Sequence, residues 1–266
     1  MTLNKGMKVF FQISSFALFI VAVFGLISAT DSAKTGKINK VVVDIEPLQN
    51  DIYLIKNDDL AKLLNKSYDL KLKNQIVEKL DLTKIEKIIE KNDFVRDAQV
   101  YIDARNNLRI MVLQKSPILR VMLSDNTTFF IDESGKKLPV SKQAVLRLPV
   151  LTGALPAFKN EMTKDKKNVY YKAFEVIKAI YKDPFMSAMT EQLLVDENKD
   201  ISIIPKLGNH KIILGDATDL ENKFKKLAIF YKEGMPPEGW SLYKEINLKF
   251  KNQVVAKKVE GEPIKN

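Results

Sequence analysis

The sequence predicts an α+β fold in which two soluble modules follow one apolar segment. Three observations support this prediction. Residues 9–29 form an uncharged apolar run, residues 38–115 mix strand and helix patterns, and residues 116–259 hold many short strand patterns beside two longer helical ones. The spacing of apolar residues distinguishes strands from amphipathic helices. We expect a single transmembrane helix, then a small β-α-α-β-β module, then a larger mixed α/β module dominated by an antiparallel sheet.

The apolar run from Val9 to Ala29 contains no charged residue. At about 1.5 Å per helical residue it would span roughly 31 Å, close to the thickness of a bilayer's hydrocarbon core. The side chains expected to contact lipid are Val9, Phe10, Phe11, Phe16, Leu18, Phe19, Ile20, Val21, Val23, Phe24, Leu26 and Ile27.

The same run could instead be a cleaved signal peptide, since Ile27-Ser28-Ala29 resembles a small-residue cleavage site. Its length favours an anchor that is kept, because signal-peptide cores are usually about 7–15 residues long. A long domain that follows a short tail is translocated largely regardless of its charge. We therefore expect a cytoplasmic N-terminus and soluble modules outside the cytoplasm.

In the small module, Thr83 and Glu86 have the spacing of a capping box at the start of a helix. Asn106-Asn107 is a hairpin turn signal between two strands. The expected strands and helices, in chain order, are Ile38–Ile45, Asp58–Leu64, Thr83–Lys91, Ala98–Ile102 and Leu108–Leu113.

The larger module begins with a hairpin and contains two amphipathic helices. Asp183-Pro184 should end the first helix, because proline cannot continue one. Asp132-Glu133 falls in a turn and is interpreted as a solvated pair rather than a catalytic one. The expected elements are Ile118–Leu123, Thr127–Ile131, Val169–Tyr181, Gln192–Asp196, Asp200–Pro205, His210–Leu214, Asp219–Glu233, Trp240–Phe250 and Gln253–Lys258.

The composition excludes several kinds of chemistry. The chain has 43 Lys and Arg against 33 Asp and Glu, one histidine and no cysteine. Disulfides, thiol nucleophiles, zinc modules and His-dependent triads are therefore excluded. The positive charge is mostly diffuse lysine, whereas nucleic-acid readers usually gather arginine in a patch. We expect no enzyme activity, no cofactor, no metal, no nucleic acid and no small-molecule substrate.

Several motifs, taken in order, resemble the FtsQ/DivIB family of bacterial cell-division proteins. Asn92–Val100 is similar to the helix-to-strand signature of a POTRA domain. The family often has Arg and Tyr at the positions of Lys249 and Phe250. The segments that carry the rest of the resemblance are Gln114–Val121, Phe130–Asp132 with Gly135, Leu148–Gly153 and Tyr243–Phe250.

The resemblance implies a non-enzymatic, single-pass scaffold of the inner membrane that acts at the division septum, with periplasmic domains. Its expected partners are an FtsB/FtsL-like complex together with FtsK, FtsW and FtsI. The implied domains are a tail (1–8), a transmembrane helix (9–29), a linker (30–37), a POTRA domain (38–115), an FtsQ-type β domain (116–259) and a disordered tail (260–266).

The resemblance also implies partner binding by strand addition at the C-terminal edge of the β domain. An edge strand offers unpaired N–H and C=O groups to a second chain. Lysines near this edge could pair with acidic partner groups or could only guard the edge. The residues expected to bind are Lys249, Phe250, Asn252, Gln253, Val254, Val255, Ala256 and Lys257.

Two other functions compete with this interpretation. One is a POTRA-containing component of envelope assembly or secretion. Such proteins normally carry repeated POTRA units or an outer-membrane barrel, and the sequence shows neither pattern. The other is a secreted hydrolase, for which we find no nucleophile or acid pair in a recognisable spacing.

Overall fold

The computed structural model describes residues 36–67, 72–235 and 240–259. The chain divides into two compact units, Met1–Gln114 and Lys115–Asn266. The predicted anchor at 9–29 and the tail at 260–266 lie outside the described residues. Within the described ranges, no helix has both the length and the apolar character needed to cross a bilayer.

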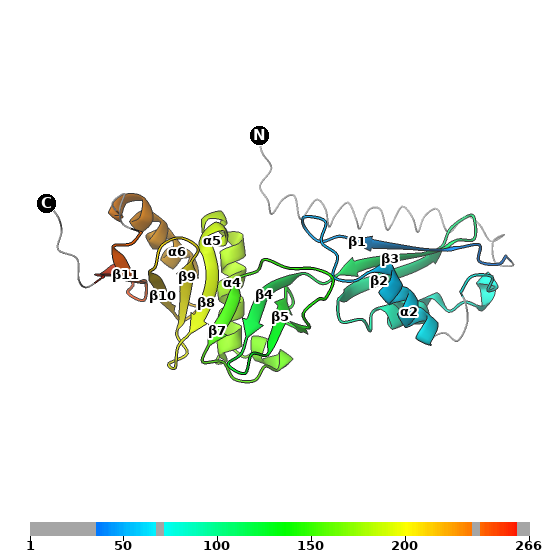
Figure 1. Cartoon of the computed structure of the whole chain (residues 1–266), viewed down its shortest axis with the longest axis horizontal. Coiled ribbons are helices and arrows are strands. Elements are labelled where there is room, and N and C mark those ends of the chain that lie inside the picture. Colours follow the sequence, from blue (N-terminus) through cyan, green and yellow to red (C-terminus); the bar gives the residue numbers. More distant parts are fainter. Residues whose placement is uncertain (1–35, 68–71, 236–239, 260–266) are drawn as a thin grey trace. The chain divides into compact units, whose positions relative to one another are not determined.

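The first unit has the predicted β-α-α-β-β order (Figure 1). Its described strands form a sheet in the order β1-β3-β2, in which β1 runs parallel to β3 and β2 runs antiparallel to it. Its elements are β1 (Val41–Glu46), α2 (Asn57–Ser67), the 3₁₀ helix η2 (Val77–Lys79), α3 (Leu82–Ile89), β2 (Val95–Ile102) and β3 (Leu108–Gln114).

The core of the first unit lies between the helices and one face of this sheet. Ile85, Ile88 and Ile89 of α3 are buried with Val100 and Ile110 of the sheet. The predicted capping box at Thr83 and Glu86 is wrong. Asp81 caps α3 instead, since its side chain accepts a hydrogen bond from the Lys84 N–H at 2.9 Å. The Glu86 side chain binds the backbone of β2 instead.

Glu86 reaches from α3 to the edge of the sheet. Its Oε1 accepts a hydrogen bond of 2.9 Å from the N–H of Val100 in β2. Because β2 is an edge strand, this N–H has no partner in β3 and the carboxylate satisfies it. A side chain of the same unit therefore already binds the outward N–H group in the middle of the β2 edge.

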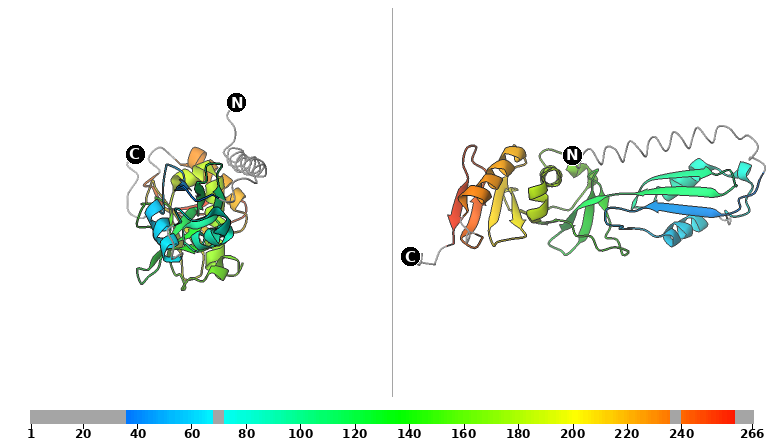
Figure 2. Two further views of the ribbon diagram at one scale, coloured as in Figure 1. Left: turned by 90° about the vertical axis from the view of Figure 1, so that its right-hand side faces the viewer. Right: turned by 90° about the horizontal axis from the view of Figure 1, so that it is seen from above.

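The second unit is a mixed sheet with helices packed on it (Figures 1 and 2). Its described strands follow the order β12-β11-β10-β9-β8-β7-β4-β5-β6. Its elements are β4 (Pro117–Met122), β5 (Thr128–Asp132), β6 (Lys137–Leu138), β7 (Val150–Gly153), the 3₁₀ helix η3 (Asn160–Thr163), α4 (Val169–Lys182), α5 (Pro184–Met189), β8 (Thr190–Val195), β9 (Ile201–Pro205), β10 (Lys211–Gly215), α6 (Leu220–Ile229), the π-helical turn η4 (Phe230–Gly234), β11 (Tyr243–Asn247) and β12 (Val255–Lys258).

Among these described strands, five neighbouring pairs are antiparallel and three are parallel. The α+β class is confirmed. Antiparallel pairs are the majority in this sheet, as expected, but parallel pairs make up a larger part of it than the sequence suggested. The buried side chains of α4, such as Val176 and Ile177, share one core with Leu193 of β8 and Ile246 of β11. This core fixes the C-terminal strands against the helices.

The predicted break at Asp183-Pro184 ends α4 but does not end helical structure. Asp183 caps a new helix, α5, because its side chain accepts from the N–H groups of Phe185 and Met186 at 2.9 and 3.0 Å. Pro184 takes the first helical position, where a missing N–H costs nothing. The sequence therefore encodes a change of helix direction at this point.

Asp132 is not the solvated turn residue that the sequence suggested. It is 2 % exposed. Its Oδ1 accepts from the N–H of Ser134 at 2.9 Å, from its hydroxyl at 2.6 Å and from the N–H of Lys136 at 2.8 Å. The carboxylate therefore organises the turn between β5 and β6.

We predict that Asp132→Ala destabilises the second unit by about 2 kcal/mol, because a buried carboxylate that holds several donors is lost. Denaturant unfolding followed by circular dichroism measures this. Ser134→Ala removes only the hydroxyl bond and should cost less than half as much. Equal stability of the wild type and Asp132→Ala would contradict the role of Asp132.

Candidate partner-binding edge

β12 forms one edge of the larger sheet in the part of the chain that the structure describes. It begins two residues later than the sequence predicted, at Val255. Of the residues expected to bind a partner, Val255, Ala256 and Lys257 lie in this strand. The others, Lys249, Phe250, Asn252, Gln253 and Val254, lie in the turn between β11 and β12.

The hydrogen-bond pattern shows which groups of β12 point outward. The N–H of Leu248 donates to the carbonyl oxygen of Ile213 in β10, and backbone groups alternate in direction along a strand. Asn247 of β11 therefore faces β12, and its partner Val255 faces β11. By the same alternation, Ala256 and Lys258 present their N–H and C=O groups to the open edge.

A second bond, from the Val259 N–H to Leu242 O at 3.0 Å, gives the same alternation. The side chains alternate as well. Val254 packs against the core, whereas Val255 is 43 % exposed. β12 therefore has one side-chain face on the domain and the other toward solvent. At Ala256 the backbone N–H and C=O groups point to the open edge, where an added strand could bond to them.

Lysine side chains hold the turn before β12. The Nζ of Lys226, from α6, donates to Phe250 O at 2.6 Å and to Lys251 O at 3.3 Å. Lys249 pairs with Asp200 at 2.5 Å, and this partner raises the pKa of Lys249. Both contacts link the turn to elements distant in the sequence, so they fix where β12 begins.

A buried lysine supports the same region. Lys223 of α6 is 6 % exposed, and its Nζ lies 3.0 Å from Oδ1 of Asp216 and 3.2 Å from Asp216 O. Hydrogen bonds from Thr218 and then Lys223 lower the pKa of Asp216 to about 2. The ion pair ties α6 to the end of β10, beneath the turn.

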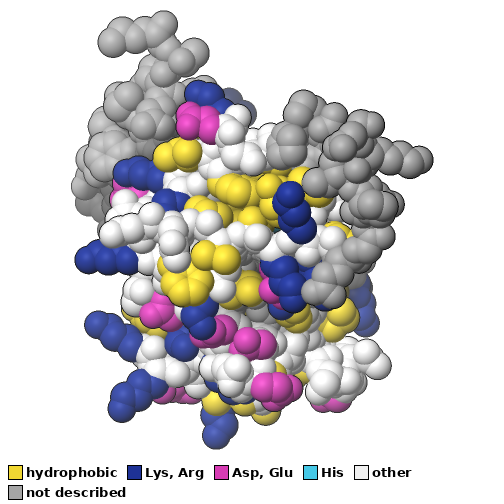
Figure 3. All heavy atoms as spheres, turned by 90° about the vertical axis from the view of Figure 1, so that its left-hand side faces the viewer, with side chains coloured by type: hydrophobic (Ala, Val, Ile, Leu, Met, Phe, Trp, Pro, Cys, Tyr) yellow, Lys and Arg dark blue, Asp and Glu magenta, His cyan; other side chains and the backbone are white. Residues whose placement is uncertain are grey.

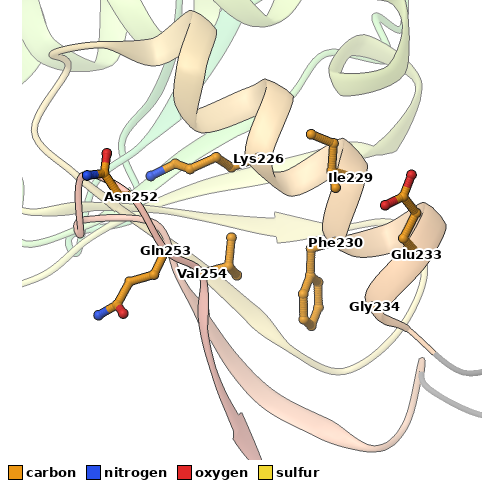
Figure 4. Close-up of a pocket in the computed structure, with 8 residues that line it drawn as sticks. All are labelled: Lys226, Ile229, Phe230, Glu233, Gly234, Asn252, Gln253 and Val254. Atoms are coloured by element: carbon orange, nitrogen blue, oxygen red, sulfur yellow. The ribbon is translucent and has the colours of Figure 1, made fainter.

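A groove of about 350 Å³ lies between α6 and the segment that leads into β12 (Figure 4). We call it the edge groove. Ile229, Phe230 and Val254 give it an apolar floor, with Lys226 and Glu233 at its sides. Asn252, Gln253 and Gly234 complete its lining. The groove adjoins the open strand, so a chain added to β12 could place a side chain in it.

The surface around this edge exposes apolar side chains between lysines (Figure 3). Ile229 is 56 % exposed, Phe250 46 % and Val259 52 %. Large apolar side chains that gather on a surface often mark an interaction site. The edge strand, the groove and these side chains lie on the same end of the unit.

An aromatic cluster stands behind the groove, and sequence reasoning did not find it. Tyr231 stacks on Trp240 with ring centroids 5.2 Å apart, and Phe230 meets Tyr243 edge-on at 5.4 Å. The Tyr231 hydroxyl also hydrogen-bonds Nε2 of the buried His210. Burial lowers the pKa of His210. The available signal was the adjacent aromatic pair Phe230-Tyr231, with Trp240 and Tyr243 following within thirteen residues.

Within the described residues, no group of three or more His, Asp or Glu side chains could hold a metal ion. The geometry of this end of the unit offers backbone groups and apolar surface, which suit contact with another chain.

The fold and the edge define a protein class: a POTRA-like domain followed by a larger mixed-sheet domain with an open C-terminal strand. Residues 37–113 match the POTRA-like domain family. Residues 116–257 match the family described as FtsQ/DivIB, C-terminal related, and the chain belongs to that family. No curated protein matches the chain.

We predict that Lys226→Met loosens the turn before β12, because two carbonyl oxygens lose a charged donor. Hydrogen exchange of amides 248–258 should rise about fivefold, which corresponds to about 1 kcal/mol. Lys225→Met is the matched control, since Lys225 pairs on the surface with Glu221 of the same helix. Equal exchange in the two variants would contradict a clamp by Lys226.

We also predict that the second unit loses stability as the pH falls below about 6.5, the ordinary pKa of histidine. The folded-state pKa of His210 is lowered, so the unfolded state binds the proton first. Stability is therefore complete above that pH and declines toward the lowered pKa, by at most about 1.4 kcal/mol per pH unit. Chemical unfolding at pH 7.5 and 5.5 measures the decline.

The control for this pH dependence is His210→Gln, which lacks a group that titrates in this range. Its stability should change less than that of the wild type between the two pH values. An identical decline in both proteins would assign the pH dependence to other groups.

Proposed function

We propose that this protein is a non-enzymatic scaffold of the bacterial division machinery that binds an FtsB/FtsL-like complex by strand addition at β12. The single observation that carries the proposal is the open edge, at which Ala256 and Lys258 face outward. Membership of the FtsQ/DivIB-related family supports the division role.

Strand addition gives a reason for the turn before β12 to be held in place in the absence of a partner. An added strand gains affinity from main-chain hydrogen bonds and specificity from pockets for alternate side chains. The turn clamped by Lys226 holds β12 in place before binding, which reduces the entropy cost of ordering it. The edge groove beside Val254 then supplies a place for one apolar partner side chain.

The proposed setting is the inner membrane at the septum, with residues 9–29 as a single span and both units in the periplasm. The uncharged run of 21 residues in the sequence supports this placement. In that setting, FtsK, FtsW and FtsI are further candidate partners. A scaffold held at the membrane would keep its POTRA-like and FtsQ-related units available to them.

We predict that Ala256→Pro weakens binding of the FtsB-like partner by roughly tenfold, because it removes an outward N–H and blocks the ladder. The domain should stay folded, since this N–H does not serve β11. Co-purification of the full chain with its partner measures the loss. Cells that carry only this variant should grow as filaments without septa.

Two comparison variants make the test specific. Ala256→Val keeps the N–H and should bind as the wild type does, whereas Val255→Pro removes a donor to β11 and should lower the stability of the hairpin. Unchanged binding by Ala256→Pro would reject strand addition at β12. Normal septation with envelope defects after depletion of the protein would instead favour a POTRA-type assembly role.

A further inference from the structure

We propose that β1 of the POTRA-like unit pairs with β1 of a second copy, which joins two such units through one continuous sheet. The two edges of this sheet differ. The edge at β2 is occupied by Glu86, which accepts the Val100 N–H. β1 has only β3 as a neighbour in the described ranges. β1 belongs to the first unit and is separate from the proposed partner-binding strand β12 of the second.

The backbone hydrogen bonds show which groups β1 leaves open. The N–H of Leu108 donates to Lys40 O at 3.0 Å, so Lys40 faces β3. By the alternation of a strand, Val42 and Asp44 face β3 as well, and Val41, Val43 and Ile45 face outward. The segment before β1 is already closed, since Ile38 bonds with Gln75 and Asn74. The open edge is therefore confined to Val41–Glu46.

This open edge is complementary to itself in an antiparallel register centred on Val43. Val43 then meets Val43 of the second copy, and Val41 meets Ile45 of the second copy. These outward-facing residues can exchange ladder hydrogen bonds. Their side chains lie on the core face of the sheet, where Val41, Val43 and Ile45 already pack on the core. The pairing would continue an apolar face across both copies.

The same register also matches charges. It places Lys40 opposite Glu46 of the second copy, and the two-fold axis creates this pair twice. Both residues are exposed. Opposite charges across a strand pair are favourable and like charges are not. A register shifted toward the C-terminus would instead set Asp44 against Asp44, so the charges select one alignment.

Cysteine cross-linking of the full chain in membranes tests the register, because the natural sequence has no cysteine. The proposed pairing places Val42 opposite Asp44 of the second copy. Two differently tagged copies, one with Val42→Cys and one with Asp44→Cys, should form a disulfide on mild oxidation. Copies that both carry Val42→Cys should link far less, since diagonal neighbours lie about 7–8 Å apart.

Charge exchange supplies the second arm of the test. In the cross-linking pair, Lys40→Glu or Glu46→Lys on both copies should each lower the disulfide yield by about fivefold, because both ion pairs become repulsive. The double variant Lys40→Glu with Glu46→Lys should restore the yield. Absence of the mixed disulfide, equal linking in the Val42→Cys control, or no rescue by the double variant would overturn the proposal.

Discussion

The backbone hydrogen-bond ladder of a β-sheet must stop at two edges, and the treatment of those edges governs both units of this protein. An unpaired N–H or C=O group needs water, a side chain or another chain. In the first unit, Glu86 supplies a side-chain acceptor at β2. In the second, one edge ends in the two-residue strand β6, which is too short to recruit a partner easily. Among the strands that the structure describes, β1 and β12 are left as the edges able to receive a chain.

Lysine side chains fix the position of the β12 edge. Some of the lysines that the sequence shows only as diffuse positive charge therefore have a structural role. Lys226 donates to backbone oxygens of the turn, Lys223 pairs with Asp216 beneath it, and Lys249 pairs with Asp200. These contacts are made by side chains with long apolar stems, which can cover apolar surface while the ammonium group reaches a distant acceptor. A part of the positive charge therefore holds the structure together near the candidate site.

The sequence predicted the fold class well, because the periodicity of apolar residues is a local signal. Element order in the first unit and the two long helices of the second followed from it. The cap at Asp81, the Glu86 bond to Val100 and the His210–Tyr231 pair could not be predicted, since each depends on which residues the fold brings together. The expected strand Trp240–Phe250 was too long for the same reason: β11 ends at Asn247, and the contact from Lys226 holds Phe250 in the turn that follows.

The structure also narrows the question of whether lysines at the β12 edge select a partner or only guard the strand. Lys249 is engaged by Asp200, so binding an acidic partner group would require that ion pair to break. Lys226 is engaged by the turn. Selection is then better supplied by the apolar floor of the edge groove at Ile229, Phe230 and Val254, where a side chain can be buried at low desolvation cost. If a partner binds by strand addition, the charges near β12 discourage unspecific strand pairing, and the edge groove provides specificity by accepting one apolar side chain of the partner.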